Sequence, residues 1–220
     1  MKDKNEIIEK CNSLQLQVKD LQYHLENEIL ARRKLHNELE DFKGNIRVYC
    51  RIRPLIANEI ERNCQIRVSN NFDNVTAVSD RPYNFHYDMV FGSNSSQEEV
   101  FEETKKMVQS AFDGYNVCIF AYGQTGSGKT FTMHGTEDHP GLAYRSIDEL
   151  YNLIAKNHKF CNITVEMQMV EIYLDNVYDL FDKSRKPLDI YEDKDTKEVI
   201  VKDGYRFKVK QAADMHNAYR

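Results

Sequence analysis

Apolar residues return every three or four positions through the first 42 residues, and no Gly or Pro interrupts residues 7–42. With Ile7 placed at heptad position d, nine of the eleven a and d positions are apolar, Cys11 included. These positions are Ile7, Cys11, Leu14, Val18, Leu21, Leu25, Glu28, Arg32, Leu35, Leu39 and Phe42. A seven-residue repeat is typical of a two-stranded coiled coil, whereas a helix packed on a globular body favours a stripe with the 3.6-residue period. The pattern therefore predicts a coiled-coil helix over residues 1–43, in which Glu28 and Arg32 weaken the seam locally and help to fix its register.

The pattern changes at Gly44, which we expect to end this helix as a C-terminal cap. Residues 46–52 then alternate between apolar and polar side chains and stop before Pro54, as a strand does. Val117–Tyr122 is a short apolar run, which is typical of a strand buried on both faces.

Helices and strands are expected to alternate through the rest of the chain. Ser96 and Glu99 have the spacing of a capping box and predict a helix over 96–112. We further expect turn and strand at 81–91, a helix at 142–155, a long strand at 163–173 and short strands near 188–192, 198–202 and 205–209. The alternation predicts a layered α/β domain over residues 44–220.

A glycine-rich loop follows the run that ends at Tyr122. It reads Gly123, Gln124, Thr125, Gly126, Ser127, Gly128, Lys129 and Thr130, and it fits the pattern GxxxxGK(S/T). Glycines let successive backbone N–H groups turn inward toward a phosphate, Lys129 can reach the β- and γ-phosphates, and Thr130 can ligate Mg²⁺. A surface turn is the alternative, but the predicted strand before the loop and helix after it favour a nucleotide site.

Composition excludes several classes of function. The net charge of −5 gives no general attraction to nucleic acid or to an anionic membrane. No apolar run is long enough to cross a bilayer, and the charged N-terminus does not resemble a signal peptide. The five cysteines include no CxxC pair, and the seven histidines form no HExxH motif, so we expect reduced thiols and no metal bound by protein ligands alone. These features predict a soluble, cytoplasmic protein.

The string FAYGQTGSGKTFTM around the loop resembles the phosphate loop of kinesin motors. Residues 45–54, 96–101 and 170–173 resemble further kinesin segments, and the similarity extends from about Glu28 to the end of the chain. The junction formed by residues 31–37 and 43–47 is similar to that of C-terminal-motor kinesins, in which a dimeric coiled coil precedes the motor. The resemblance implies a P-loop NTPase fold of the kinesin type behind a coiled-coil neck. It also implies ATP and Mg²⁺ as cofactors, a homodimer, and ATP-driven movement toward microtubule minus ends.

The resemblance also assigns an adenine pocket. Arg51, Arg53 and Pro54 would form one wall, and Phe131 takes the place of the aromatic residue that faces it. A flat base can stack on an arginine or an aromatic ring. Without the resemblance, the two arginines read as the solvent-facing positions of a strand and Phe131 as a core residue.

A second set of residues falls where kinesins touch tubulin. The basic cluster Lys183, Arg185 and Lys186 lies in the corresponding loop, and Tyr191 and Lys194 lie in a second similar segment. Microtubules are acidic, so a basic loop suits them, although a solvated turn is the alternative. The expected location is the cytoskeleton, on microtubules, with the spindle as one candidate.

Two kinesin switch segments, which resemble NxxSSRSH and DLAGSE, are absent from these 220 residues. Because phosphoryl transfer requires several groups to position Mg²⁺ and the attacking water, we expect residues 44–220 to be the N-terminal part of a motor domain. Alone, this part is expected to be inactive or poorly soluble. The alternative function is a non-catalytic, kinesin-like protein that dimerises through residues 7–42 and regulates a full-length partner.

Overall fold

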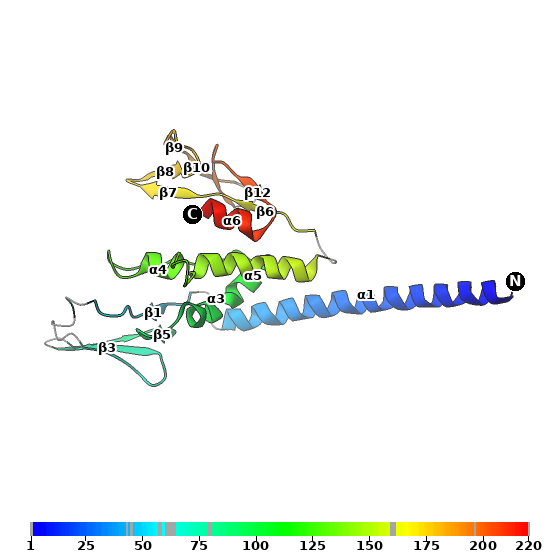
Figure 1. Cartoon of the computed structure of the whole chain (residues 1–220), viewed down its shortest axis with the longest axis horizontal. Coiled ribbons are helices and arrows are strands. Elements are labelled where there is room, and N and C mark those ends of the chain that lie inside the picture. The colour runs from blue at the N-terminus through cyan, green and yellow to red at the C-terminus, as the bar shows by residue number, and fades with distance from the viewer. Residues whose placement is uncertain are drawn as a thin grey trace. The chain divides into compact units, whose positions relative to one another are not determined.

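The computed structural model describes residues 2–42, 44, 46–56, 59, 65–78, 81–158, 162–195 and 197–219 (Figure 1). The chain divides into two compact units, Met1–Thr130 and Phe131–Arg220. The expected mixture of helices and strands is confirmed. The strands, however, do not form one layered sheet, because the described ones pair in five small sheets.

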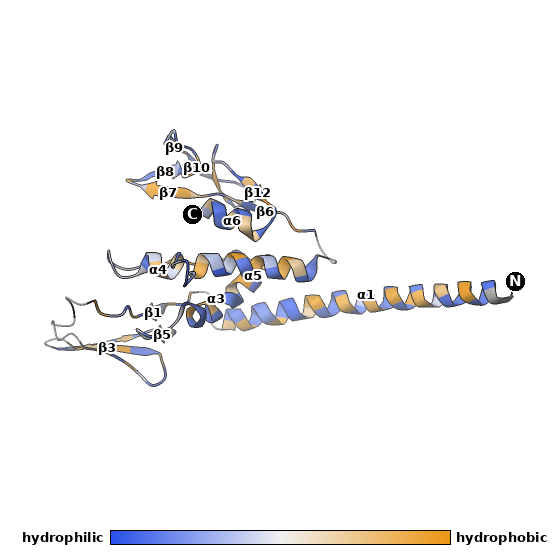
Figure 2. Ribbon diagram, in the orientation of Figure 1, coloured by the Kyte–Doolittle hydropathy of each residue, from blue (hydrophilic) through white to orange (hydrophobic). Residues whose placement is uncertain are grey.

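One uninterrupted helix, α1, spans Lys2–Phe42 and confirms the predicted element (Figure 1). Polar and apolar residues alternate along it (Figure 2), and the eight large apolar side chains of the heptad seam are 42–92% exposed. Gly44 has a φ of 95° and donates its N–H to Asp41 O at 3.0 Å, so it ends the helix as expected. The helix therefore presents an apolar seam to solvent, while its pairing in a coiled coil stays a prediction.

Between α1 and the next long helix, the strands of the first unit form two sheets. Strand β1 (Tyr49–Arg51) pairs in parallel with β5 (Met89–Phe91). Strands β2 (Gln65–Val68), β3 (Asn74–Val78) and β4 (Pro82–His86) form an antiparallel sheet. The sequence reading missed β2 and β3, because their alternation is short and polar residues surround it.

Helix α3 (Gln97–Phe112) begins at the predicted capping box. Ser96 Oγ accepts the Glu99 N–H at 3.2 Å, and Glu99 Oε2 accepts the Ser96 N–H at 3.1 Å. The apolar face of α3 packs in the core of the first unit, which contains Val75, Val90, Phe91, Val100, Phe101 and Val108.

The predicted strand at Val117–Tyr122 is wrong. These residues form no strand, Cys118 is exposed, and the side chains of Phe120 and Tyr122 are 78% and 93% exposed. An apolar run becomes a strand only where neighbouring strands pair with its N–H and C=O groups. No strand within the described ranges pairs with it, so apolar composition alone was a misleading signal.

The second unit is built on helix α5 (Leu142–Asn157), which confirms the predicted helix. The short helix α4 (Lys129–Met133) precedes it, and α6 (Ala212–Tyr219) contacts both α5 and strand β12 (Phe207–Val209). The buried apolar residues of the second unit are Leu142, Ile147, Leu153, Met167, Val177 and Val209.

The remaining strands of this unit are short. Strand β6 (Val165–Met167) pairs with β12, and β10 (Ile190–Glu192) pairs with β11 (Val199–Val201). Strands β7 (Val170–Tyr173), β8 (Asn176–Asp179) and β9 (Pro187–Leu188) form a third sheet.

The single long strand predicted at 163–173 is therefore interrupted between β6 and β7. Met169 O accepts the Leu180 N–H, and the side chain of Gln168 lies against Gly204, where a Cβ would meet its Nε2 at 2.1 Å. The segment before Gln168 pairs with β12 and the segment after Met169 pairs with β8, so they form two separate strands.

Candidate nucleotide-binding loop and neck contact

The conformation of the glycine-rich loop explains its glycines. Gly126 and Gly128 have φ angles of 81° and 102°, a region that side chains with a Cβ adopt at a cost. Gly123 has a φ of 154°, and a Cβ there would lie 2.5 Å from Ser127 Oγ, so a larger residue would have to displace the Ser127 side chain. Ser127 N donates to Gln124 O at 3.1 Å and closes the turn. The loop is thus a tight backbone cradle of the kind that suits a phosphate group.

Lys129 bends back over this loop. Its Nζ donates to Gly123 O at 2.7 Å and to Gln124 O at 2.9 Å. The ammonium group therefore lies at the mouth of the cradle, where a phosphate oxygen could exchange for these carbonyls. Thr130 follows at the start of α4 with an exposed side chain, so its hydroxyl is accessible as a Mg²⁺ ligand.

The residues present fit Mg²⁺ only together with a phosphate. Within the described ranges, no group of three or more His, Cys, Asp or Glu side chains could hold a metal ion. Mg²⁺ is commonly held by one or two protein oxygens plus substrate phosphates, which matches the single hydroxyl of Thr130.

The predicted adenine wall makes other contacts. Arg51 donates to Gln97 Oε1 at 2.8 Å and to Ser95 O at 3.4 Å, and burial lowers the pKa of its guanidinium. Arg53 pairs with Glu59 at 2.6 Å, which raises the Arg53 pKa. Both arginines are therefore committed to residues outside the glycine-rich loop.

Pro54 is exposed, and Phe131 begins the second unit with a side chain that is 43% exposed. A cavity of about 430 Å³ in the first unit is lined by Ile52 and Ser95 among others, and by no residue of the glycine-rich loop. The adenine assignment thus stays a prediction.

The basic cluster lies on an exposed turn of the second unit. Asp182 Oδ1 accepts the Ser184 N–H at 2.8 Å, and the bonds from Ser184 lower the Asp182 pKa. Arg185 has a φ of 50° and pairs with Glu171 at 3.1 Å, while Lys183 and Lys186 are exposed. The turn therefore presents its two lysines to solvent.

The second predicted contact segment is also exposed. Tyr191 lies in β10 opposite Ile200, and Lys194 follows in the next turn. This placement is compatible with contact to a partner and does not by itself identify one.

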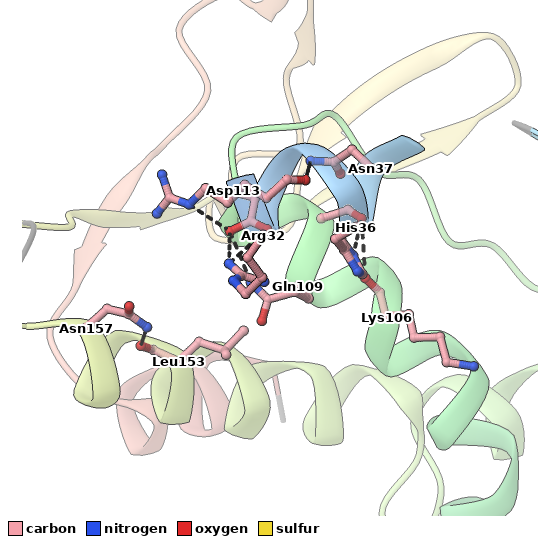
Figure 3. A network of polar contacts seen from close by, with 10 residues as sticks. Arg32, His36, Asn37, Lys106, Gln109, Asp113, Leu153 and Asn157 are labelled. Carbon is pink, nitrogen blue, oxygen red and sulfur yellow. Dashed lines mark hydrogen bonds and ion pairs between the residues drawn. The ribbon is translucent and has the colours of Figure 1, made fainter. Parts of the chain in front are cut away.

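A buried carboxylate joins the end of α1 to the end of α3 (Figure 3). The side chain of Asp113 is fully buried, and its Oδ1 lies 3.2 Å from both Arg32 Nη2 and Arg33 Nε. Gln109 Nε2 donates to the same oxygen at 3.1 Å. Arg32 thus contacts the end of α3, an interaction that its heptad position did not predict, and its role in a coiled-coil seam stays a prediction.

Two further pairs extend this junction. We call the whole set the neck contact: Arg32 and Arg33 with Asp113, His36 with Ser110, and the pair Glu40–Arg47 beside them. His36 Nε2 lies 3.1 Å from Ser110 Oγ, and Arg47 pairs with Glu40 at 2.7 Å with both side chains largely buried. Burial opposes the charge on Arg47, but hydrogen bonds to Glu40 and Tyr49 outweigh it and raise its pKa.

Sequence reasoning missed the neck contact, although one signal was present. Asp113 caps the C-terminal end of α3, where the helix dipole disfavours a negative charge. A cation nearby stabilises an acidic residue in that position, and Arg32 and Arg33 each provide one.

Comparison with known proteins places this geometry in a family. Residues 25–181 match the family model described as "Microtubule binding". The chain is 44% identical over 190 residues to the kinesin-like protein KIN-14E of Arabidopsis thaliana, which covers 84% of this chain and 15% of that protein. It is 48% identical over 168 residues to KIN-14I of Oryza sativa subsp. japonica, which covers 74% of this chain and 13% of that protein.

A solved structure agrees with these relatives. The C-terminal motor and motor homology domain of Kar3Vik1, fused to a synthetic heterodimeric coiled coil, superposes with a TM-score of 0.83 at 34% identity. The match covers 96% of this chain and 58% of that one. The chain thus spans about a seventh of the plant relatives and somewhat over half of the solved chain. These matches show that the chain belongs to the kinesins, with homology to the motor domain of the kinesin-14, C-terminal-motor type.

Proposed function

We propose that this chain supplies the nucleotide-binding part of a microtubule motor that couples ATP hydrolysis to minus-end-directed movement. The observation that carries the proposal is the backbone cradle of Gly123–Thr130, with Lys129 held across its mouth. Family membership and the match to the microtubule-binding model support the choice of ATP and of microtubules.

The glycines, Lys129 and Thr130 of the loop each have a role in this proposal. The glycines leave room for phosphate oxygens beside the backbone N–H groups, and Lys129 exchanges its two carbonyl partners for the β- and γ-phosphates. Thr130 Oγ1 ligates Mg²⁺, which neutralises charge on the phosphates when it is bound. Arg51, Arg53, Pro54 and Phe131 remain the candidates for the adenine end of the site.

Other parts of the chain are the proposed sites of microtubule binding and of dimerisation. Lys183, Arg185, Lys186, Tyr191 and Lys194 are the proposed tubulin contacts, and the seam of α1 is the proposed homodimer interface. Within the described ranges, no helix has the length and apolar character to cross a membrane. We propose a location on microtubules, including the spindle.

The Lys129→Ala substitution tests the nucleotide site. We expect it to weaken binding of a fluorescent ATP analogue with Mg²⁺ at least tenfold, because it removes a charge-assisted contact to the phosphates. Lys202→Ala, a lysine on an exposed turn, is the matched control. Equal affinity in the wild type and in Lys129→Ala would overturn the assignment of this loop.

A second candidate is a non-catalytic partner of a full-length motor. It rests on the exposed apolar seam of α1, through which such a partner would dimerise. Dimerisation that is indifferent to nucleotide and to the Lys129→Ala change would support this candidate over the first.

A further inference from the structure

One hydroxyl side chain lies within the basic cluster, and neither the nucleotide site nor the proposed tubulin contact uses it. Ser184 is the only Ser, Thr or Tyr among residues 181–190, and Lys183 precedes it while Arg185 and Lys186 follow it. All four residues are exposed on the turn that joins β8 to β9 (Figure 1). The turn therefore exposes a single nucleophilic hydroxyl with cations on both sides.

Two bonds from Ser184 to Asp182 hold the turn in shape. Asp182 Oδ1 accepts the Ser184 N–H at 2.8 Å, and the Ser184 hydroxyl donates to Asp182 Oδ2. Arg185 N lies 3.5 Å from Asp182 O, and the φ of 50° at Arg185 is uncommon for a residue with a Cβ. Because these bonds are local and exposed to solvent, the turn can open at low free-energy cost and place Ser184 in the cleft of another enzyme.

A phosphate on Ser184 would reverse the electrostatics of the turn. Three cations against the carboxylate of Asp182 give residues 182–186 a net charge of +2, and phosphoserine carries about −1.5 to −2 at pH 7. The modified Oγ has no proton to donate to Asp182, so two anions repel each other where a hydrogen bond stood. Arg185, which pairs with Glu171 at 3.1 Å, gains a phosphate as a competing partner. The phosphate thus neutralises the basic cluster and changes the shape of the turn.

We propose that Ser184 is a phosphorylation site for a basophilic serine kinase that uses ATP, and that its phosphate releases the basic cluster from tubulin. Ser184 Oγ attacks the γ-phosphorus of the kinase's ATP, so an O–P bond forms and the bond from that phosphorus to the β–γ bridging oxygen breaks. ADP leaves, and the hydroxyl proton passes to the catalytic aspartate of the kinase. Cations beside the serine suit an acidic substrate cleft. The release from tubulin rests on the proposed function, whereas the modification does not.

The modification is tested on the full 220-residue chain with protein kinase C and Mg²⁺–ATP, followed by peptide mass spectrometry. We expect phosphate on Ser184 in the wild type. The double variant Lys183→Ala/Lys186→Ala should be modified at least about threefold more slowly, because it removes charges that steer the serine into the cleft. Lys202→Ala/Lys208→Ala, which removes two exposed lysines of the same unit, is the matched control. A wild-type chain without phosphate on Ser184 would remove the modification site.

The effect on microtubules is measured with phosphoserine incorporated at position 184 during synthesis of the chain, so that no kinase is needed. Its affinity in nucleotide-free co-sedimentation should fall at least about threefold at low salt, because about two charges of the exposed turn are cancelled. The difference should shrink as salt rises, since exposed charges are screened. Phosphoserine at position 93, where Ser93 is exposed in the first unit, adds the same charge elsewhere and should change the affinity less than about twofold.

Reversal of Lys183, Arg185 and Lys186 to Glu separates failure of this proposal from failure of the tubulin contact. If the reversal weakens binding but phosphoserine at 184 does not, the release is wrong. An equal loss with phosphoserine at 93 would also refute it, because net charge would then set the affinity. If the reversal leaves the affinity unchanged, the proposed contact and the release fail together, and mass spectrometry still decides whether Ser184 is modified.

Discussion

At the scale of single residues, Asp113 is the clearest example of a side chain whose role depends on a distant segment. Its carboxylate is fully buried and faces Arg32 and Arg33, which lie 81 and 80 positions earlier in the chain. A buried charge is tolerated only when it is paired and hydrogen-bonded, and both conditions hold here. Removing the charge should therefore release the end of α1.

We expect Asp113→Asn to destabilise the neck contact by about 1–2 kcal/mol, since the amide can keep the Gln109 bond but not both ion pairs. Hydrogen exchange over the last turns of α1 should rise about tenfold, while the first turns stay unchanged. Asp20→Asn, the same change on the exposed part of α1, serves as the control. Identical exchange in the two variants would show that Asp113 does not hold the neck.

At the scale of elements, the exposed turn of Lys183, Arg185 and Lys186 can be tested as a tubulin contact. Reversing the three charges to Glu should weaken microtubule co-sedimentation about tenfold at low salt, because exposed pairs contribute about 0.2–1 kcal/mol each. The difference should shrink as salt rises, since exposed charges are screened. Reversing Lys202, Lys208 and Lys210, which are also exposed, gives the same charge change away from the turn. A similar loss in both triple variants would mean that net charge, not this turn, sets the affinity.

Local signals predicted those elements whose structure depends on their own sequence. The heptads gave α1, the Ser96–Glu99 capping box gave the start of α3, and Gly44 ended α1 as expected. Prediction failed at Val117–Tyr122 and at Gln168, because a strand exists only where a neighbour pairs with it.

The candidate site also contains features that local sequence predicts and features that depend on distant residues. The glycine spacing predicted a tight loop, and the positive φ angles of Gly126 and Gly128 agree with it, while phosphate binding by the loop stays a prediction. The neck contact joins residues far apart in the sequence, so no local pattern could reveal it apart from the acidic end of α3.

At the scale of the whole molecule, the untested feature with the largest consequence is pairing of α1 between two chains. The seam residues Leu14 and Leu21 are 51% and 66% exposed in the single chain, and a partner helix would bury them. Their replacement by Asp should weaken the dimer at least about a hundredfold, because each buried Leu contributes about 1.5–3 kcal/mol.

Leu16 offers a matched control for this experiment, because it is 68% exposed on the same helix but lies outside the a and d positions. Sedimentation velocity over a range of concentrations should show a dimer for the wild type and for Leu16→Asp, and a monomer for Leu14→Asp/Leu21→Asp. A monomeric wild type would refute the coiled coil. Loss of the dimer in Leu16→Asp as well would mean that apolar surface in general, and not the heptad seam, holds two chains together. Only the expected pattern would show that the a and d positions form the dimer interface. Arg32 occupies one of these positions and contacts Asp113, so the coiled-coil seam and the neck contact meet at this residue.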